Sequence, residues 1–173
     1  MYKFIFGILI TLIVVLPVNA DMQAQKTPVS QIEKNLPEFK SVSGKFKQEK
    51  FIGKRVLVSS GTFEFQKGKG VIFNTTYPIK SRTEYSSKNN RYVNDVILAI
   101  SKRNFSVLEK NFDMYMKTEK NGVWYIFMTV KNQEIKQHIE ALRIDGCKDR
   151  LTALEIWQLN PNSSTKIKFT YGG

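Results

Sequence analysis

VSGKFKQEKFIGKRVLVSSGTFEFQKGKGVIFNTTYP, residues 42–78, is the stretch that decides the fold. It holds three segments in which apolar and polar residues alternate, with the period of a half-buried β-strand. The apolar positions are Phe46 in the first segment, Phe63 and Phe65 in the second, and Val71 and Phe73 in the third. Residues 51–55 and 67–70 are expected to connect the segments. We therefore expect three consecutive antiparallel strands with one shared apolar face.

The rest of the chain predicts further antiparallel strands and a few short helices. Apolar residues at helical spacing follow Thr27 and Pro28, and again occupy residues 96–108. A helical turn or loop is expected at residues 133–137. Strands are expected at residues 79–85, 91–94, 112–116, 123–128, 139–144, 151–159 and 166–171. Residues 123–128 are apolar throughout, so we expect cover on both faces, with a helix on one side. The fold class is mainly β, with one strongly curved antiparallel sheet.

The first twenty residues have the three-part build of a secretory signal peptide. Lys3 is followed by an apolar run, and the run ends at Pro17 and Ala20 before the polar Asp21. An uncleaved anchor helix is the alternative. We expect export with cleavage after Ala20, which makes residues 21–173 one domain of ordinary size. The formal net charge of +12 favours an anionic partner, and an exported protein seldom meets nucleic acid.

Catalytic constellations are hard to build from this sequence. His138 is the single histidine and Cys147 the single cysteine, so no histidine-based or thiolate metal cluster and no intramolecular disulfide is expected. A set of nucleophile, histidine and acid is equally unconvincing. The glycines around Lys67 suit a hairpin turn better than a phosphate loop, since no helix follows them. We expect neither an enzyme nor a cofactor.

Short motifs, three within the opening stretch and one at residues 104–112, resemble the outer-membrane lipoprotein carrier family (LolA-like). The likeness covers most of residues 29–171 and lies in the order and spacing of four pieces. They are Phe46-x-Gln48, Ser59-Ser60-Gly61-Thr62-Phe63-x-Phe65, Gly70-Val71-Ile72-Phe73 with Pro78 five residues on, and Asn104-Phe105-Ser106-Val107-Leu108-Glu109 with Phe112 three residues on.

The resemblance implies an incomplete antiparallel β-barrel with a helical lid over an apolar cavity. It also implies a monomeric periplasmic carrier of a Gram-negative bacterium, which takes acylated lipoprotein from an inner-membrane transporter to an outer-membrane receptor. We expect Phe46, Phe63, Phe65, Val71, Phe73, Phe127, Ile167 and Phe169 to form the lipid-binding cavity, and Ile97, Ile100, Phe105 and Leu108 to belong to the lid. Lys67 stands where the family has an arginine linked to holding the lid, so Lys67 is the candidate latch, although lysine lacks the planar guanidinium fork.

Three other interpretations stay open at this point. The cargo could be another lipid or a glycolipid, or the domain could be a periplasmic lipid sensor or adaptor of the same fold. The aromatic face could also form only a sealed core. A lipid-modifying enzyme is disfavoured by the missing histidine and nucleophile sets.

Overall fold

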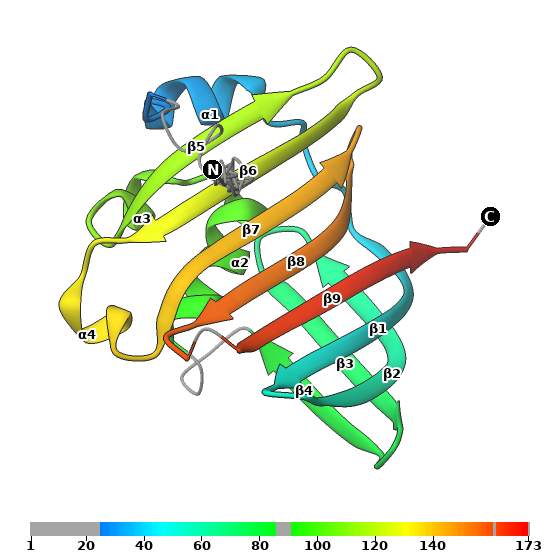
Figure 1. Cartoon of the computed structure of the whole chain (residues 1–173). Coiled ribbons are helices and arrows are strands. Elements are labelled where there is room, and N and C mark those ends of the chain that lie inside the picture. Colours follow the sequence, from blue (N-terminus) through cyan, green and yellow to red (C-terminus); the bar gives the residue numbers. More distant parts are fainter. Residues whose placement is uncertain (1–24, 86–90, 161, 173) are drawn as a thin grey trace, which may run out of the picture.

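The computed structural model describes residues 25–85, 91–160 and 162–172, which form one antiparallel sheet and four short helices (Figure 1). The helices are α1 (Val29–Asn35), α2 (Arg91–Lys102), α3 (Ser106–Glu109) and α4 (Gln133–Lys136). The strands are β1 (Val42–Ile52), β2 (Arg55–Gln66), β3 (Gly70–Tyr77), β4 (Ser81–Tyr85), β5 (Phe112–Thr118), β6 (Val123–Val130), β7 (Ile139–Cys147), β8 (Arg150–Gln158) and β9 (Ser163–Tyr171).

The nine strands lie in the order β4-β3-β2-β1-β9-β8-β7-β6-β5. Every neighbouring pair is antiparallel, and only β1 and β9 are neighbours without being consecutive in the chain. The prediction of a mainly β, antiparallel fold with short helices is confirmed. The sheet is open, because β4 and β5 stand at its two edges, so the described strands do not close into a barrel. Figure 1 shows α2 on the inner side of this sheet, between β1–β4 and β5–β9.

The stretch at residues 42–78 forms β1, β2 and β3, as its alternation predicts. Phe46, Phe63, Phe65 and Phe73 are all at most 5 % exposed and belong to one core. β2 is longer than expected, since it begins at Arg55 and leaves only a two-residue turn after β1. The segment at 67–69 is the turn between β2 and β3, as predicted.

Glycine allows two close approaches between these strands. A Cβ on Gly44 would lie 2.3 Å from the carbonyl oxygen of Thr170, and one on Gly61 would lie 2.0 Å from that of Asn74. Gly61 also adjoins a shift in the β2–β3 register. Any side chain at either position would push neighbouring strands apart, so both glycines are needed for the sheet to pack as it does.

The helix α2 replaces a strand that the sequence analysis placed at residues 91–94. That prediction is wrong. Val93, Val96, Ile97 and Ile100 follow the spacing i, i+3, i+4 and i+7, which gives one apolar face of a single helix that starts at Arg91. Val96, Ile97 and Ile100 are buried in the core, and Val93 packs against it.

The run at residues 123–128 is not covered equally on its two faces, contrary to expectation. In β6 the residues Trp124, Ile126 and Met128 are buried, whereas Tyr125 and Phe127 on the other face are half-buried. The guanidinium of Arg143 lies 4.5 Å from the centre of the Tyr125 ring and covers it from the next strand. Side chains of neighbouring strands thus partly cover the outer face of β6.

The predicted signal peptide at residues 1–20 lies outside the described residues. None of the helices in the described part of the chain is long and apolar enough to cross a membrane. The assignment of residues 21–173 to one domain stays a prediction.

Candidate functional site

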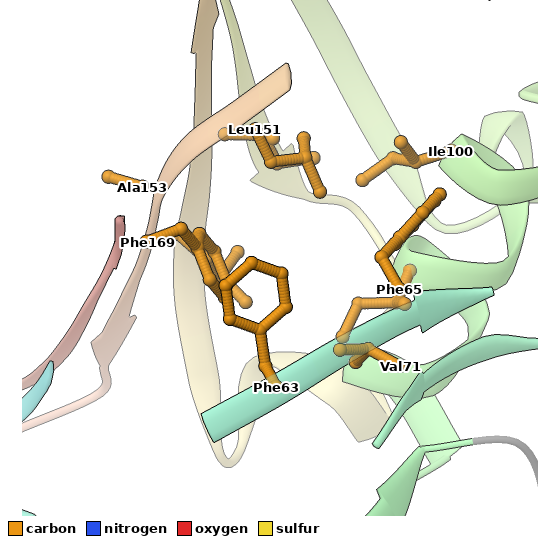
Figure 2. Close-up of a pocket in the computed structure, with 10 residues that line it drawn as sticks. Phe63, Phe65, Val71, Ile100, Leu151, Ala153 and Phe169 are labelled. Atoms are coloured by element: carbon orange, nitrogen blue, oxygen red, sulfur yellow. The ribbon is translucent and has the colours of Figure 1, made fainter. Parts of the chain in front are cut away.

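An apolar cavity lies between α2 and the inner face of the sheet (Figure 2). Its free volume is about 20 Å³, room for about one water molecule. All of its lining residues are apolar. They are Phe63, Phe65, Val71, Ile97, Ile100, Ile144, Leu151, Ala153, Leu154 and Phe169.

The lining comes from strands that are far apart in the sheet order. β2 contributes Phe63 and Phe65, which occupy alternate positions and so share a face, and β9 contributes Phe169. The Phe63 and Phe169 rings meet edge to face, with centroids 4.9 Å apart. Leu151 and its neighbours reach the cavity from β8. Residues of β2, β3, β7, β8 and β9 thus line one space on the inner face of the sheet.

Ile97 and Ile100 supply the helical side of the cavity. They are three residues apart, so both lie on the same face of α2. Ile100 is 2 % exposed and Ile97 is 6 % exposed. The two isoleucines line the cavity opposite the aromatic side chains of the sheet.

Ser101 fastens the end of α2 to the β2–β3 turn. Its hydroxyl oxygen accepts a hydrogen bond from the backbone N–H of Gly68 at 2.5 Å. The same hydroxyl donates to the carbonyl oxygen of Gln66 at 3.1 Å. Ser101 is 3 % exposed, so the Gly68 N–H relies on this side chain in a place that water reaches poorly, whereas the Gln66 carbonyl also accepts from the Lys69 N–H at 3.0 Å.

A second connection joins the chain after α2 to α1. The Arg103 guanidinium donates a hydrogen bond to the carbonyl oxygen of Glu33, and the Glu33 side chain accepts one from the backbone N–H of Phe105 at 2.8 Å. Arg103 has a φ of 51°, which ends α2 in the left-handed region. Its Nε is buried without a hydrogen-bond partner among the described residues. Sequence reasoning missed Arg103 and Ser101, because a lone polar residue at a helix end gives no signal of its distant partner.

Lys67 does not bond to α2 through its side chain. Its Nζ pairs with the carboxylate of Glu38, in the segment between α1 and β1, and its backbone N–H donates to the hydroxyl of Ser41 at 3.1 Å. The hydrogen bond with Lys67 lowers the pKa of Glu38. The contact from this turn to α2 is made by the next residue, Gly68. The side chain that joins α2 to this turn is therefore that of Ser101, and the latch role of Lys67 stays a prediction.

Of the predicted cavity and lid residues, six line the cavity. They are Phe63, Phe65, Val71 and Phe169 from the sheet, with Ile97 and Ile100 from α2. Phe46 and Phe73, whose rings are 4.8 Å apart, line a separate open groove of about 310 Å³ beside the β3–β4 turn. Ile167, Phe105 and Leu108 are buried in the core away from the cavity lining.

Phe127 lies on the opposite face of the sheet. Since Ile126 and Met128 point into the core, the alternation of β6 turns Phe127 outward. There its ring meets that of Trp157, with centroids 5.8 Å apart. Its inclusion in the cavity was wrong, because the run at residues 123–128 is apolar on both faces and its composition does not distinguish them. The contributions of β7 and β8, Ile144, Leu151, Ala153 and Leu154, were not predicted.

Chemistry-bearing side chains are scattered over the surface. His138 is exposed after α4, and Cys147 is a half-buried free thiol at the end of β7. Within the described ranges, no group of three or more His, Cys, Asp or Glu side chains is placed to hold a metal ion.

No protein-family model matches the chain, and no curated protein matches it in sequence. Several solved structures are similar to it in fold, including these two. One is a LolA superfamily protein from Nitrosomonas europaea, with 8 % sequence identity, a TM-score of 0.37, and coverage of 83 % of this chain and 92 % of that one. The other is a DUF1329 family protein from Desulfovibrio piger, with 10 % identity, a TM-score of 0.36, and coverage of 82 % and 88 %. The chain thus has structural similarity to a LolA superfamily protein and a DUF1329 family protein over more than four fifths of its length.

Proposed function

We propose that this protein is a periplasmic carrier that holds the acyl chains of a lipoprotein or related lipid between α2 and the sheet. The observation that carries the proposal is the exclusively apolar lining of a space closed by one short helix. An apolar cavity with no polar group to fix orientation suits a hydrocarbon chain better than a polar metabolite. In this proposal the carrier ferries its cargo from the inner towards the outer membrane of a Gram-negative bacterium.

For loading, α2 has to move away from the sheet so that the acyl chain can take its place. Moving α2 aside exposes the side chains of Ile97 and Ile100 together with the aromatic residues that they cover. An acyl chain then regains about 0.8 kcal/mol for each methylene that it buries. Because the helix and the cargo cover the same apolar surface, loading and release differ little in free energy, as a carrier requires.

The export signal expected at residues 1–20 and the likeness of the sequence motifs to lipoprotein carriers support this location and cargo. An inner-membrane transporter and an outer-membrane receptor are the partners that the proposal implies. A non-lipoprotein lipid or glycolipid would use the same cavity. A sensor of the same fold would bind its lipid without passing it on, so transfer between donor and acceptor vesicles separates the two roles.

The direct test is the lipid content of the protein. Mass spectrometry of an organic extract from the purified chain is expected to find acyl lipids, and the delipidated chain is expected to take up a fluorescent fatty acid. A chain that is free of acyl ligand and takes up no fatty acid would overturn the carrier function and leave the aromatic face as a sealed core.

A Ser101→Ala variant tests the movement of α2. It leaves the Gly68 N–H without its hydrogen-bond acceptor, which costs about 1–3 kcal/mol in the closed state, while the Gln66 carbonyl still accepts from the Lys69 N–H. We expect faster uptake of the fluorescent fatty acid, by about tenfold if 1.4 kcal/mol of this cost falls on closure. Ser106→Ala is the matched control, since Ser106 is exposed and bonds only locally, to Asn104 at 2.6 Å. Equal uptake rates in both variants would mean that α2 does not open.

A further inference from the structure

The hairpin formed by β1 and β2 exposes apolar side chains at its tip. Its two strands pair up to Ile52 and Arg55, with Gly53 and Lys54 as the turn. Gly53 has a φ of 58°, as the first residue of a two-residue hairpin turn commonly has. A Cβ placed on Gly53 would meet nothing within 4 Å. The tip is therefore open around its turn.

Three large apolar side chains at this tip face solvent. Ile52 is 44 % exposed, Val56 is 47 % exposed and Leu57 is 57 % exposed. The strand register pairs Ile52 with Arg55, Leu57 with Lys50, and Val56 with Phe51. Ile52 and Leu57 thus share one face of the hairpin, and Val56 lies on the other. Apolar exposure on both faces is unusual for a hairpin that ends in water.

The same tip carries positive charge without compensation. Lys50, Lys54 and Arg55 lie in it, and no acidic residue occurs between Glu49 and Glu64. None of the three cations belongs to an ion pair within the described part of the chain. Other lysines of the sheet do have carboxylate partners, such as Lys166 with Glu155 at 3.1 Å.

The β8–β9 turn extends the tip. The backbone N–H of Gly53 donates to the carbonyl oxygen of Asn162 at 2.9 Å, and Ile52 pairs with Ser163 at the start of β9. Leu159, at the end of β8, is 56 % exposed. This turn contacts the hairpin at its tip and adds a fourth exposed apolar side chain at the same end of the sheet.

We propose that the tip of the β1–β2 hairpin docks on an anionic lipid surface. Exposed aliphatic side chains would enter the boundary between headgroups and acyl chains, while Lys50, Lys54 and Arg55 would contact the lipid phosphates. The net charge of +12 favours approach to such a surface over approach to a neutral one. A protein groove would need shape-matched contacts on both faces of the hairpin, whereas a lipid surface accommodates both faces at once. The proposal does not depend on the cavity, because it requires only the tip.

Vesicle co-sedimentation of the whole chain without residues 1–20 tests the docking. The vesicles are phosphatidylcholine alone, or phosphatidylcholine with phosphatidylglycerol, at low and high salt. We expect binding to the anionic vesicles to exceed binding to the neutral ones and to weaken with salt. A Lys54→Gln, Arg55→Gln double variant is expected to lose about 25-fold in partitioning, at about fivefold for each cation.

The apolar part of the contact is tested with an Ile52→Ser, Leu57→Ser double variant. We expect its partitioning to anionic vesicles to fall by about tenfold or more, since it loses two aliphatic side chains. Val107→Ser is the matched control, because Val107 is 54 % exposed on α3 and outside the tip. All variants change exposed side chains, and circular dichroism and urea midpoints verify that they fold.

Three results would overturn the docking. They are equal binding to neutral and anionic vesicles, unchanged binding in the Ile52, Leu57 variant, and an equal loss in Val107→Ser. A tip that binds no vesicle but joins two copies of the chain in sedimentation velocity would identify a protein contact in place of a lipid one. None of these results depends on fatty-acid uptake, so the docking and the carrier function fail separately.

Discussion

Shortening Ile100 to alanine separates a movable lid from a sealed core. Ile100 is 2 % exposed and lines the cavity from α2. The change removes three carbon atoms, which lowers the apolar stabilisation of the closed helix by about 2.4 kcal/mol, at about 0.8 kcal/mol for each carbon group. If α2 opens to admit cargo, the ratio of open to closed forms rises by roughly 50-fold, since 1.4 kcal/mol is about a factor of ten.

The assay is titration of the delipidated chain with a fluorescent fatty acid, beside urea unfolding. Apparent affinity scales with the fraction of protein that is competent to bind, so Ile100→Ala is expected to bind the probe several-fold to 50-fold more tightly. Its free energy of unfolding is expected to fall by about 2–5 kcal/mol, as for other buried large-to-small changes.

Ile135→Ala is the matched control for this experiment. Ile135 is 0 % exposed and lies in a helix, α4, but it is not part of the cavity lining. We expect a similar loss of stability and no gain in affinity. If both variants lose stability equally and neither changes fatty-acid binding, Ile100 is ordinary core and the reasoning about α2 is refuted.

Three further predictions concern the surroundings of the cavity. Lys67→Ala is expected to raise the pKa of Glu38 towards its usual value, seen by NMR titration, and to leave the urea midpoint nearly unchanged, because both side chains are more than half exposed. Burial raises the pKa of Tyr171 to about 12, so the folded state keeps this proton where the unfolded state loses it, and stability is expected to fall as the pH rises from about 10 to about 12. Urea unfolding at several pH values measures this stability, and tyrosinate absorbance follows the ionisation of Tyr171. A stability that does not change with pH in that window would contradict the prediction. Gly146→Ala would place a Cβ 2.0 Å from the Trp124 ring. We expect the free energy of unfolding, measured with heat or urea, to fall by about 1–3 kcal/mol and the tryptophan emission to change. An unchanged unfolding midpoint would argue against that packing.

Period-two alternation was enough to predict most of the sheet. Phe63 and Phe65 reach the core because every second residue of β2 faces the same way, a property of the strand alone. Where both faces are apolar, the same rule cannot choose between them, and Phe127 was misplaced for this reason. Its direction is set by Trp124 and Ile126, which face the helices, and that arrangement depends on the whole sheet.

The hydrogen bonds between segments that are distant in the chain could not be predicted from the sequence. Ser101 meets Gly68, and Arg103 meets Glu33, across 33 and 70 residues of chain. Each is a single polar residue at the end of α2, where capping or solvent exposure is the ordinary expectation. Only the position of α2 against the β2–β3 turn and α1 brings these partners together. The hydrogen bonds that hold the end of α2 could therefore be identified only from the structure.

Because the cavity is small, the free energy needed for loading is mainly that of moving α2. With about 20 Å³ free, the closed form offers no room for a methylene chain. If the protein carries lipid as proposed, its affinity for cargo equals the affinity of the open form reduced by the cost of opening. That cost has two parts, namely the apolar contacts of Ile97 and Ile100 and the hydrogen bonds of Ser101 and Arg103. The apolar part is returned when the cargo covers the same sheet residues, whereas the hydrogen bonds are returned only when the helix closes again. On the proposed function, the polar fastenings at the end of α2 are therefore what favours release, and weakening them is expected to turn a carrier into a protein that retains its lipid.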